Sequence, residues 1–411
     1  MCIRDRPMTP SGKRDDAALR RTELDTGTAV APTPPRDALE QSLAAIFGDM
    51  LNRPGIGVHD DFFAVGGTSL TAMRLIVTIE KRFGIRMPLT AFVAAPTIAM
   101  LADKLRSGEA VAAFDPVVPI RTGPADGSGR TPVFLVHPLG GNVLCYVRLA
   151  RHLPDDQPLY ALQAAGGEPG TEPVTTMAGL ARSYLDAIKR VQPEGPYRIG
   201  GWSFGGFVAF EMARELRRTG EAELSQLILL DSIAPDPGER PEVAEQAMME
   251  WFFWELIWVD RGGSAPVDRI PAELTTDDGR LDYIAERAAA VGIVPVATAR
   301  TAIRRLFEVY KANWNSLRDY KPAPEPINLT LVKATAPLPD VLKPMHGAAR
   351  TLHDAPANGW ATLTGGRVDV VEVPGDHLLL LDEPYVQSVG QAITPPDTTE
   401  TEHTLQEGTA H

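Results

Sequence analysis

The arrangement of this chain is constrained most by short apolar runs that alternate with longer helical stretches between residues 133 and 373. Each run is rich in Val, Ile, Leu or Tyr, whereas the stretches between them show the spacing of a helical face. Strands that alternate with helices predict a mostly parallel sheet with helices packed on it. The predicted strands are 133–136, 159–162, 197–200, 227–230, 329–332 and 368–373.

The alternation lapses between Asp231 and Leu329, where the sequence reads as helical. We expect a helical insertion here that lies over the sheet as a lid, at about 236–325. Its aromatic run at 251–258 either shapes a pocket and limits the access of water or packs in the interior of the insertion. The sequence leaves both interpretations open.

Charge and cysteine content exclude several classes of function. Lys and Arg number 40 against 53 Asp and Glu, and the formal net charge of −13 would repel nucleic acid and anionic lipid. Cys2 and Cys145 are too few for a disulfide framework or a four-ligand zinc site. No apolar stretch reaches the roughly 20 residues that a membrane span needs, and none has the form of a signal peptide. We therefore expect a cytoplasmic protein with no nucleic-acid or membrane partner and no metal.

A different pattern precedes the alternating region, at residues 37–107. Two stretches with one apolar helical face each are followed by a short segment between Pro88 and Pro96, and Thr97 is a suitable N-cap for a last helix. This pattern predicts a small four-helix bundle.

Three further segments have compositions that disfavour packing. Residues 1–36 are expected to be mostly disordered, and 108–129 to be a linker to a second domain at 130–392. Residues 393–411 contain acidic residues but no Lys or Arg, which predicts a disordered acidic tail.

The second domain contains the sequence Gly201-Trp-Ser-Phe-Gly205, which matches G-x-S-x-G between a predicted strand and a predicted helix. In this context a sharp turn exposes the serine, here Ser203, as a nucleophile. A serine hydroxyl needs a general base, usually a histidine oriented by a carboxylate. The motif therefore predicts two catalytic partners elsewhere in the chain.

The expected partners follow later strands. Asp231 ends the run 227–230, and His377 follows the last predicted strand, which gives the order Ser, Asp, His. Asp231 could instead be a turn or helix cap. The competing residues are Asp260 and Asp340 for the acid, and His346 and His353, which we expect at the surface, for the base.

The negative charge that forms on the reacting carbonyl oxygen needs backbone N–H donors. We expect these from Phe204, after the nucleophile, and from Leu139, in the loop His137-Pro-Leu-Gly-Gly141 after the first strand of the domain. His137 is interpreted as shaping this loop and receives no catalytic role.

The helical bundle carries a second serine signature. Phe62-Phe63 and Gly66-Gly67 lead to Thr68-Ser69-Leu70 at a predicted helix start, with no histidine or lysine placed to activate Ser69. A helix N-terminus favours an attached phosphate, although Ser69 could also be an ordinary N-cap.

This stretch resembles the peptidyl carrier proteins of nonribosomal peptide synthetases, whose motif D-x-F-F-x-x-G-G-x-S-L carries 4′-phosphopantetheine on the serine. The resemblance implies that Ser69 is the attachment site and that a phosphopantetheinyl transferase modifies it. Residues 130–392 resemble type I synthetase thioesterases of the α/β-hydrolase family through His-Pro-Leu-Gly-Gly, Gly-Trp-Ser-Phe-Gly-Gly and Gly-Asp-His.

A third motif, at residues 7–19, is similar to the closing motif of adenylation domains, with Lys13 in place but Asp16 where Arg is usual. Residues 1–36 are thus expected to be an adenylation-domain remnant and linker without activation activity, and the chain to be the end of a longer terminal module. Its partners would include upstream condensation and adenylation domains.

These resemblances imply a fold class and a function. The fold is a small four-helix carrier bundle followed by an α/β-hydrolase fold with a helical lid insertion. The function is release of a peptidyl or acyl thioester through an acyl-O-serine intermediate, by hydrolysis or macrocyclisation. Alternatives are a discrete serine esterase that acts on diffusible substrates and a non-enzymatic carrier scaffold. The sequence does not name the substrate.

Overall fold

A computed structural model of the 411-residue chain describes residues 32–85, 87–107, 114–124, 128–235, 243–258, 269–337 and 350–394. Several sequence predictions lie outside these residues. They are the adenylation-like motif at 7–19, most of the acidic tail, and the competing residues Asp260, Asp340 and His346.

The second domain is built on a seven-stranded sheet in the order β1-β3-β2-β4-β5-β6-β7. All neighbouring strands are parallel except β1, which runs antiparallel to β3. The strands are β1 (Val117–Arg121), β2 (Val133–Val136), β3 (Leu159–Leu162), β4 (Tyr197–Trp202), β5 (Leu224–Leu230), β6 (Leu329–Ala334) and β7 (Val368–Val373). The six predicted strands are therefore present, and the predicted parallel sheet is confirmed.

Strand β1 is the one strand of the described residues that the sequence interpretation missed, because it lies in the predicted linker 108–129. It is a short edge strand that contains Pro119, a residue that sheets tolerate mainly at an edge. Val117 and Val118 are buried. The Pro- and Gly-rich surroundings concealed a strand whose pairing partner, β3, comes about forty residues later.

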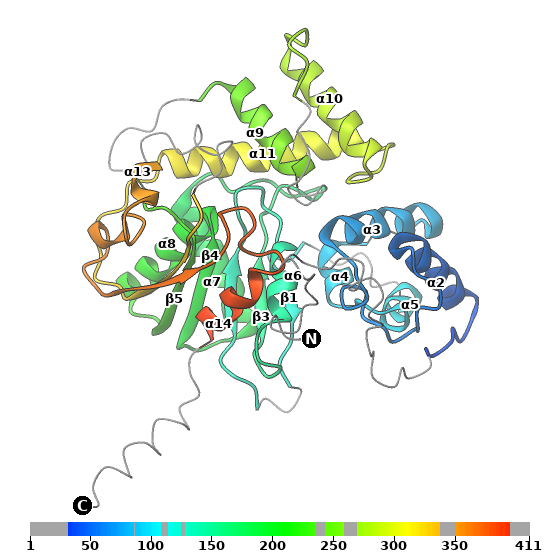
Figure 1. The fold of residues 1–411 in the computed structure, drawn as a ribbon, viewed down its shortest axis with the longest axis horizontal. Coiled ribbons are helices and arrows are strands. Elements are labelled where there is room, and N and C mark those ends of the chain that lie inside the picture. The colour runs from blue at the N-terminus through cyan, green and yellow to red at the C-terminus, as the bar shows by residue number, and fades with distance from the viewer. Residues whose placement is uncertain are drawn as a thin grey trace, which may run out of the picture.

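Helices cover both faces of the sheet (Figure 1). One face carries α7 (Met177–Val191) and α8 (Phe204–Thr219), and α8 packs against β4 and β5. The other carries α6 (Cys145–Ala150) and α14 (Val386–Ile393), which contact each other and the sheet. Two short helices, α13 (Arg350–His353) and η5 (Trp360–Thr362), lie between β6 and β7 in the chain. This three-layer arrangement confirms the predicted α/β fold class.

In its described residues, the insertion between β5 and β6 contains three helices, α9 (Glu245–Trp258), α10 (Asp277–Ala290) and α11 (Ala299–Arg318). Figure 1 shows them grouped beyond one end of the sheet. Helix α9 holds the aromatic run, and its Phe252 packs against Phe307 and Tyr310 of α11 at ring-centroid distances of 5.5 Å. At least this part of the aromatic run therefore packs inside the lid.

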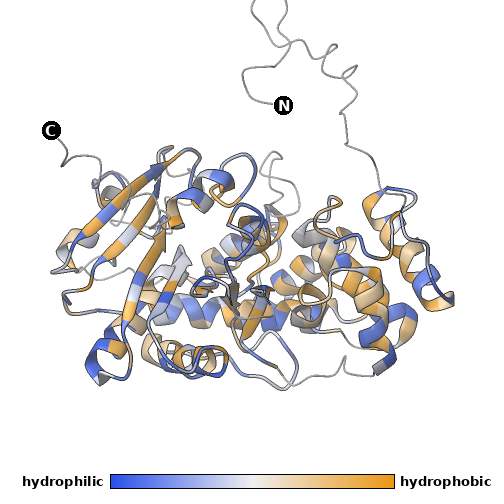
Figure 2. Ribbon diagram, turned by 90° about the horizontal axis from the view of Figure 1, so that it is seen from below, coloured by the Kyte–Doolittle hydropathy of each residue, from blue (hydrophilic) through white to orange (hydrophobic). Residues whose placement is uncertain are grey.

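The N-terminal bundle consists of α2 (Ala38–Leu51), α3 (Ser69–Phe83), α4 (Leu89–Val93) and α5 (Ile98–Ser107). Its core contains Phe47, Phe62, Phe63 and Phe92, whose rings meet edge to face at centroid distances of 5.2–5.7 Å. Figure 2 shows apolar residues running through these helices and along the strands of the sheet. The predicted four-helix bundle is present.

The bundle contacts the second domain. Helix α4 lies against β1, and the Arg74 guanidinium of α3 donates a hydrogen bond to the Val291 carbonyl at the end of α10. In the described part of the chain, no helix is long and apolar enough to cross a membrane.

Candidate active site

Ser203 lies at a sharp turn between β4 and α8. Its backbone has φ 55° and ψ −116°, a conformation that non-glycine residues rarely adopt and that costs about 1–3 kcal/mol. The turn is closed so tightly that a β-carbon on Gly201 would lie 2.7 Å from the Gly205 Cα. The two glycines of G-x-S-x-G are thus required by close approach of the backbone, and the turn presents Ser203 at the carboxyl end of the sheet.

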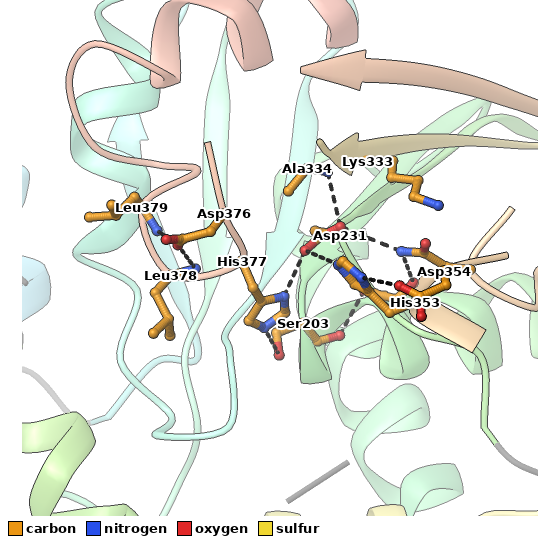
Figure 3. Close-up of polar contacts among 12 residues, drawn as sticks. Ser203, Asp231, Lys333, Ala334, His353, Asp354, Asp376, His377, Leu378 and Leu379 are labelled. Carbon is orange, nitrogen blue, oxygen red and sulfur yellow. Dashed lines mark hydrogen bonds and ion pairs between the residues drawn. The ribbon is translucent and has the colours of Figure 1, made fainter. Parts of the chain in front are cut away.

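Three residues that are far apart in the sequence meet at this end of the sheet (Figure 3). His377 Nε2 lies 3.0 Å from Ser203 Oγ, and His377 Nδ1 lies 2.9 Å from Asp231 Oδ2. Asp231 follows β5, and His377 lies in the loop after β7. The three side chains therefore have the hydrogen-bonding order of a nucleophile, a base and an orienting carboxylate.

Asp231 is fully buried, and its backbone has φ 46°. Its Oδ1 accepts hydrogen bonds from the Ala334 backbone N–H, at 3.0 Å, and from Asn358 Nδ2, at 3.4 Å. Burial alone would raise the pKa of Asp231, but the hydrogen bond and the charge of His377, with the Ala334 amide, hold this pKa below its usual value. Asp231 is thus an ionised group whose two oxygens are both engaged.

The loop that carries His377 is fixed by its neighbours. Asp376 Oδ1 accepts the backbone N–H groups of Leu378 and Leu379 at 2.9 and 3.0 Å, and Trp202 Nε1 donates to the His377 carbonyl at 3.1 Å. The Trp202 and His377 rings also lie 5.8 Å apart. These contacts hold the imidazole between the other two side chains.

The loop after β2 lies beside the nucleophile and is shaped by His137, as the sequence predicted. His137 is buried, its Nδ1 donates to the Pro138 carbonyl at 2.7 Å, and its Nε2 lies 2.7 Å from the Tyr184 hydroxyl. Burial lowers the pKa of His137 to about 4, although the hydrogen bond with Pro138 opposes the shift. The ring is therefore neutral, and because the carbonyl can only accept, Nδ1 carries the proton.

The Pro138 carbonyl also accepts the Gly141 N–H at 2.9 Å. The next carbonyl, of Leu139, accepts Nδ2 of Asn313 from the lid helix α11 at 2.8 Å. These bonds fix the orientation of the two peptide groups that follow Pro138 and Leu139. The sequence interpretation did not find Asn313, because a polar residue on a long helix carries no local signal of a contact 174 residues away.

His353 was expected at the surface, and this prediction is wrong. The side chain is buried at the end of α13, and its Nε2 lies 4.0 Å from Asp231 Oδ2, with no hydrogen-bond partner for that atom among the described residues. Burial lowers the pKa of His353. The Pro- and Ala-rich sequence around it had suggested a surface segment. In the fold, the segment that follows α13 is held to the sheet, because Lys333 of β6 donates a hydrogen bond to the Ala355 carbonyl and Asn358 donates one to the Ser232 carbonyl after β5.

Ser69 is far from these residues in the sequence and begins α3. Thr68 caps this helix through a reciprocal hydrogen-bond pair with Thr71. The preceding turn needs its glycines, since Gly66 has φ 113° and a β-carbon on Gly67 would lie 2.5 Å from the Phe62 carbonyl oxygen. Ser69 therefore follows directly on the N-cap of a 15-residue helix, where the unpaired N–H groups and the helix dipole favour a phosphate.

Comparison with known proteins agrees with both halves of the chain. Residues 131–393, more than half of the chain, match the thioesterase domain family. The chain belongs to the thioesterase family. Residues 41–105 match the phosphopantetheine attachment site family, which indicates covalently attached 4′-phosphopantetheine. The matches to these two families, in this order along the chain, confirm the resemblance to a carrier–thioesterase region that the sequence motifs implied.

Curated relatives are larger proteins. The chain is 29% identical over 394 residues to a dimodular nonribosomal peptide synthase of Bacillus subtilis, a match that covers 95% of this chain and 15% of the relative. It is 32% identical over 398 residues to chondramide synthase of Chondromyces crocatus, which covers 93% of this chain and 10% of the relative. The chain thus spans a small part of the length of these relatives.

Among solved structures, the chain is similar to a holo four-domain nonribosomal peptide synthetase bound to AMP and glycine. The TM-score is 0.61 at 29% identity, and the match covers 95% of this chain and 28% of that chain. The aligned part of this chain thus includes both the residues that match the carrier family and those that match the thioesterase family.

Proposed function

We propose that this thioesterase releases a peptidyl or acyl chain from the adjacent carrier domain through an acyl-O-Ser203 intermediate. The observation that carries the proposal is the continuous hydrogen-bonded series Ser203, His377 and Asp231 in a chain that also has a phosphopantetheine attachment domain. Because the carrier and the serine acyl-transfer site are in one chain, the carrier can supply the acyl-transfer site with a covalently held substrate.

The first step would be attack of Ser203 Oγ on the thioester carbonyl. His377 Nε2 takes the hydroxyl proton as the C–O bond forms, and the imidazolium that results is stabilised by the buried carboxylate of Asp231. When the tetrahedral intermediate collapses, the C–S bond breaks, and His377 returns the proton to the departing thiolate sulfur.

The negative charge on the carbonyl oxygen would be stabilised by the backbone N–H groups of Phe204 and Leu139. Phe204 begins α8, and N–H groups in the first turn of a helix have no acceptor within the helix. The Leu139 N–H belongs to the same peptide group as the Pro138 carbonyl. This carbonyl accepts hydrogen bonds from His137 and Gly141, which hold the peptide group in place. This arrangement would keep the donor in place before the charge develops.

The second step would repeat the chemistry with a different nucleophile. His377 removes a proton from water, or from an amine or hydroxyl group of the acyl chain, and the new bond to the carbonyl carbon displaces Ser203 Oγ, which takes up the proton. Water gives a free acid, whereas an internal nucleophile gives a ring. The lid helices α9 and α11, which border this site, would favour one outcome by admitting or excluding water.

Ser69 would hold 4′-phosphopantetheine, which supplies a terminal thiol for the thioester. Support comes from the position of this residue directly after the N-cap of α3, where an attached phosphate is favoured. A phosphopantetheinyl transferase would install the group, and upstream condensation and adenylation domains would supply the chain. The adenylation-like motif at 7–19 fits such a context.

Loss of the acyl group from the loaded protein tests the release step. The full chain is modified with an acyl-phosphopantetheine and its intact mass is followed over time, for the wild type and for Ser203→Ala. The acyl group should leave the wild type and remain on the variant. Equal rates of loss would contradict the mechanism and favour a carrier scaffold with spontaneous hydrolysis. The released products of hydrolysis and cyclisation differ by the mass of one water.

The carrier assignment has its own test. Ser69→Ala should accept no phosphopantetheine, whereas Ser42→Ala, a variant of a partly exposed serine on α2 of the same bundle, should be modified like the wild type. If Ser69→Ala is still modified, the attachment site lies elsewhere. If the wild type is not modified but cleaves diffusible esters, the chain is better described as a discrete esterase.

A further inference from the structure

One carboxyl group of the lid lies at the catalytic site but takes no part in the chemistry above. Glu255 is near the end of α9, and its Oε1 would lie 3.0 Å from a β-carbon built on Gly140, in the loop after β2. Its charge also interacts with that of His377. The carboxyl group therefore stands between the lid and the loop that carries Leu139, on the side of the catalytic base.

This carboxyl group has no directly paired cation in the described part of the chain, although the charge of His377 acts on it from further away. No Lys, Arg or His there forms an ion pair with Glu255 within 4.0 Å. The residue as a whole is partly exposed, but burial of its carboxyl group raises the pKa to about 7, against opposing effects of His377 and a hydrogen bond from the Gly140 backbone. An ionised carboxylate in such a position is costly unless a cation joins it.

The other titratable groups that interact with Glu255 are Tyr310 on α11 and Cys145 on α6. Neither carries a positive charge in any protonation state, and burial followed by the charge of Glu255 raises the pKa of Tyr310. The Tyr310 side chain is fully buried, and its hydroxyl has no hydrogen-bond partner among the described residues. Buried hydroxyl groups are rarely left unpaired, so this one is a candidate for a ligand contact.

Tyr310 is also one helical turn from Asn313, which holds the Leu139 carbonyl. The unpaired hydroxyl is thus on the same side of α11 as the residue that fixes the loop beside Ser203. Glu255 of α9 and Tyr310 of α11 interact with each other, and both helices contact the loop beside Ser203, α9 through Glu255 at Gly140 and α11 through Asn313 at Leu139.

We propose that Glu255 and Tyr310 form a subsite, called here the amine subsite, that binds a protonated amine of the acyl chain held on Ser203. A protonated amine is a cation with up to three N–H donors, and the carboxylate and the phenol oxygen can accept two of them. The inference rests on the proposed acyl transfer to Ser203 and adds a substrate class to it, namely acyl chains that carry a basic amine.

The preference for such chains should depend on pH. A protonated Glu255 attracts a cation less than an ionised one, so the preference should increase as pH rises through about 7, the pKa of the free subsite. Groups that take part in the acyl transfer itself affect the rates of both kinds of substrate, whereas the amine subsite affects only the rates of cationic substrates. The ratio of rates for a cationic and a neutral substrate at each pH therefore isolates Glu255.

The test uses the full chain and N-acetylcysteamine thioesters of two series. One series has ω-aminoacyl chains of increasing length, and the other has unsubstituted acyl chains of matching size. Release of the thiol gives kcat/KM for acylation of Ser203. We expect the wild type to prefer the amine over its neutral counterpart about tenfold at one chain length, as a charge-assisted hydrogen bond would give.

In Glu255→Gln this preference should fall to about one, and in Tyr310→Phe it should decrease. Glu250→Gln also removes one negative charge from the same helix, and this variant should retain the preference for the amine. A preference that survives in Glu255→Gln, or a wild type without preference at every chain length, would overturn the amine subsite while leaving the acyl transfer intact. Absence of thiol release from both series would overturn the acyl transfer and the subsite together.

Discussion

Gly205→Ala should reduce activity far more than stability, because this glycine fixes the start of α8, whose Phe204 N–H we propose as a donor to the oxyanion. A β-carbon at position 205 would lie 2.9 Å from the His137 carbonyl oxygen and still closer to that of Val136, whereas carbon–oxygen contacts are normally about 3.3–3.6 Å. Val136 ends β2, a strand paired on both sides, and cannot withdraw easily. The start of α8, including the Phe204 N–H, must move instead.

The magnitudes follow from this displacement. Overpacking of this kind costs about 1–3 kcal/mol, and the better helix propensity of alanine recovers about 0.5–1 kcal/mol. The net loss of about 0–2.5 kcal/mol would lower Tm by no more than about 10 °C in a domain of this size. A donor misplaced by about 1 Å costs roughly a hundredfold in rate.

The assay is hydrolysis of an acyl-N-acetylcysteamine thioester, with thermal unfolding measured on the same samples. Gly167→Ala is the matched control, since its β-carbon would meet nothing nearer than 3.7 Å and its φ is not positive. We expect the control to match the wild type and Gly205→Ala to lose about a hundredfold in kcat. A Gly205→Ala protein with wild-type kcat would refute the inferred role of the Phe204 amide.

Three further predictions concern single residues. Asn313→Ala should leave the buried Leu139 carbonyl unpaired, lower the free energy of unfolding by about 1–3 kcal/mol and reduce kcat more than it changes KM; an unchanged kcat would show that Asn313 does not support the proposed oxyanion donor at Leu139. Ser203→Gly should be more stable than Ser203→Ala by about 1 kcal/mol in urea unfolding, because glycine relieves the positive φ; the opposite order would show that the turn is unstrained. His137 should weaken the fold in acid: its pKa is about 4 when folded and 6.5 when unfolded, so its stabilising contribution is complete above pH 6.5 and is lost as pH falls toward 4. In His137→Gln the urea midpoint should depend less on pH over that range. A midpoint that falls as steeply with pH as in the wild type would assign the acid sensitivity to other groups.

Much of the fold was predictable because its signals are local. The strands of the sheet are short apolar runs between turn residues, and Gly201 and Gly205 stand at the spacing that a strand–turn–helix needs. Asp231 and His377 were found by their position after strands, since the carboxyl ends of parallel strands lie at one edge. Strand β1 was missed because its only neighbour in the sheet is remote in sequence.

By itself, the sequence determined the order of elements, the nucleophile turn and the serine at the start of α3, since each depends on residues within a few positions of one another. Only the tertiary structure decided that His353 is buried beside Asp231, that Asn313 holds the Leu139 carbonyl, and that Glu255 lies against the same loop at Gly140. Each of these contacts joins residues that are more than a hundred positions apart in the sequence. Burial, charge and hydrogen bonding there depend on which surfaces meet, and no local pattern records that.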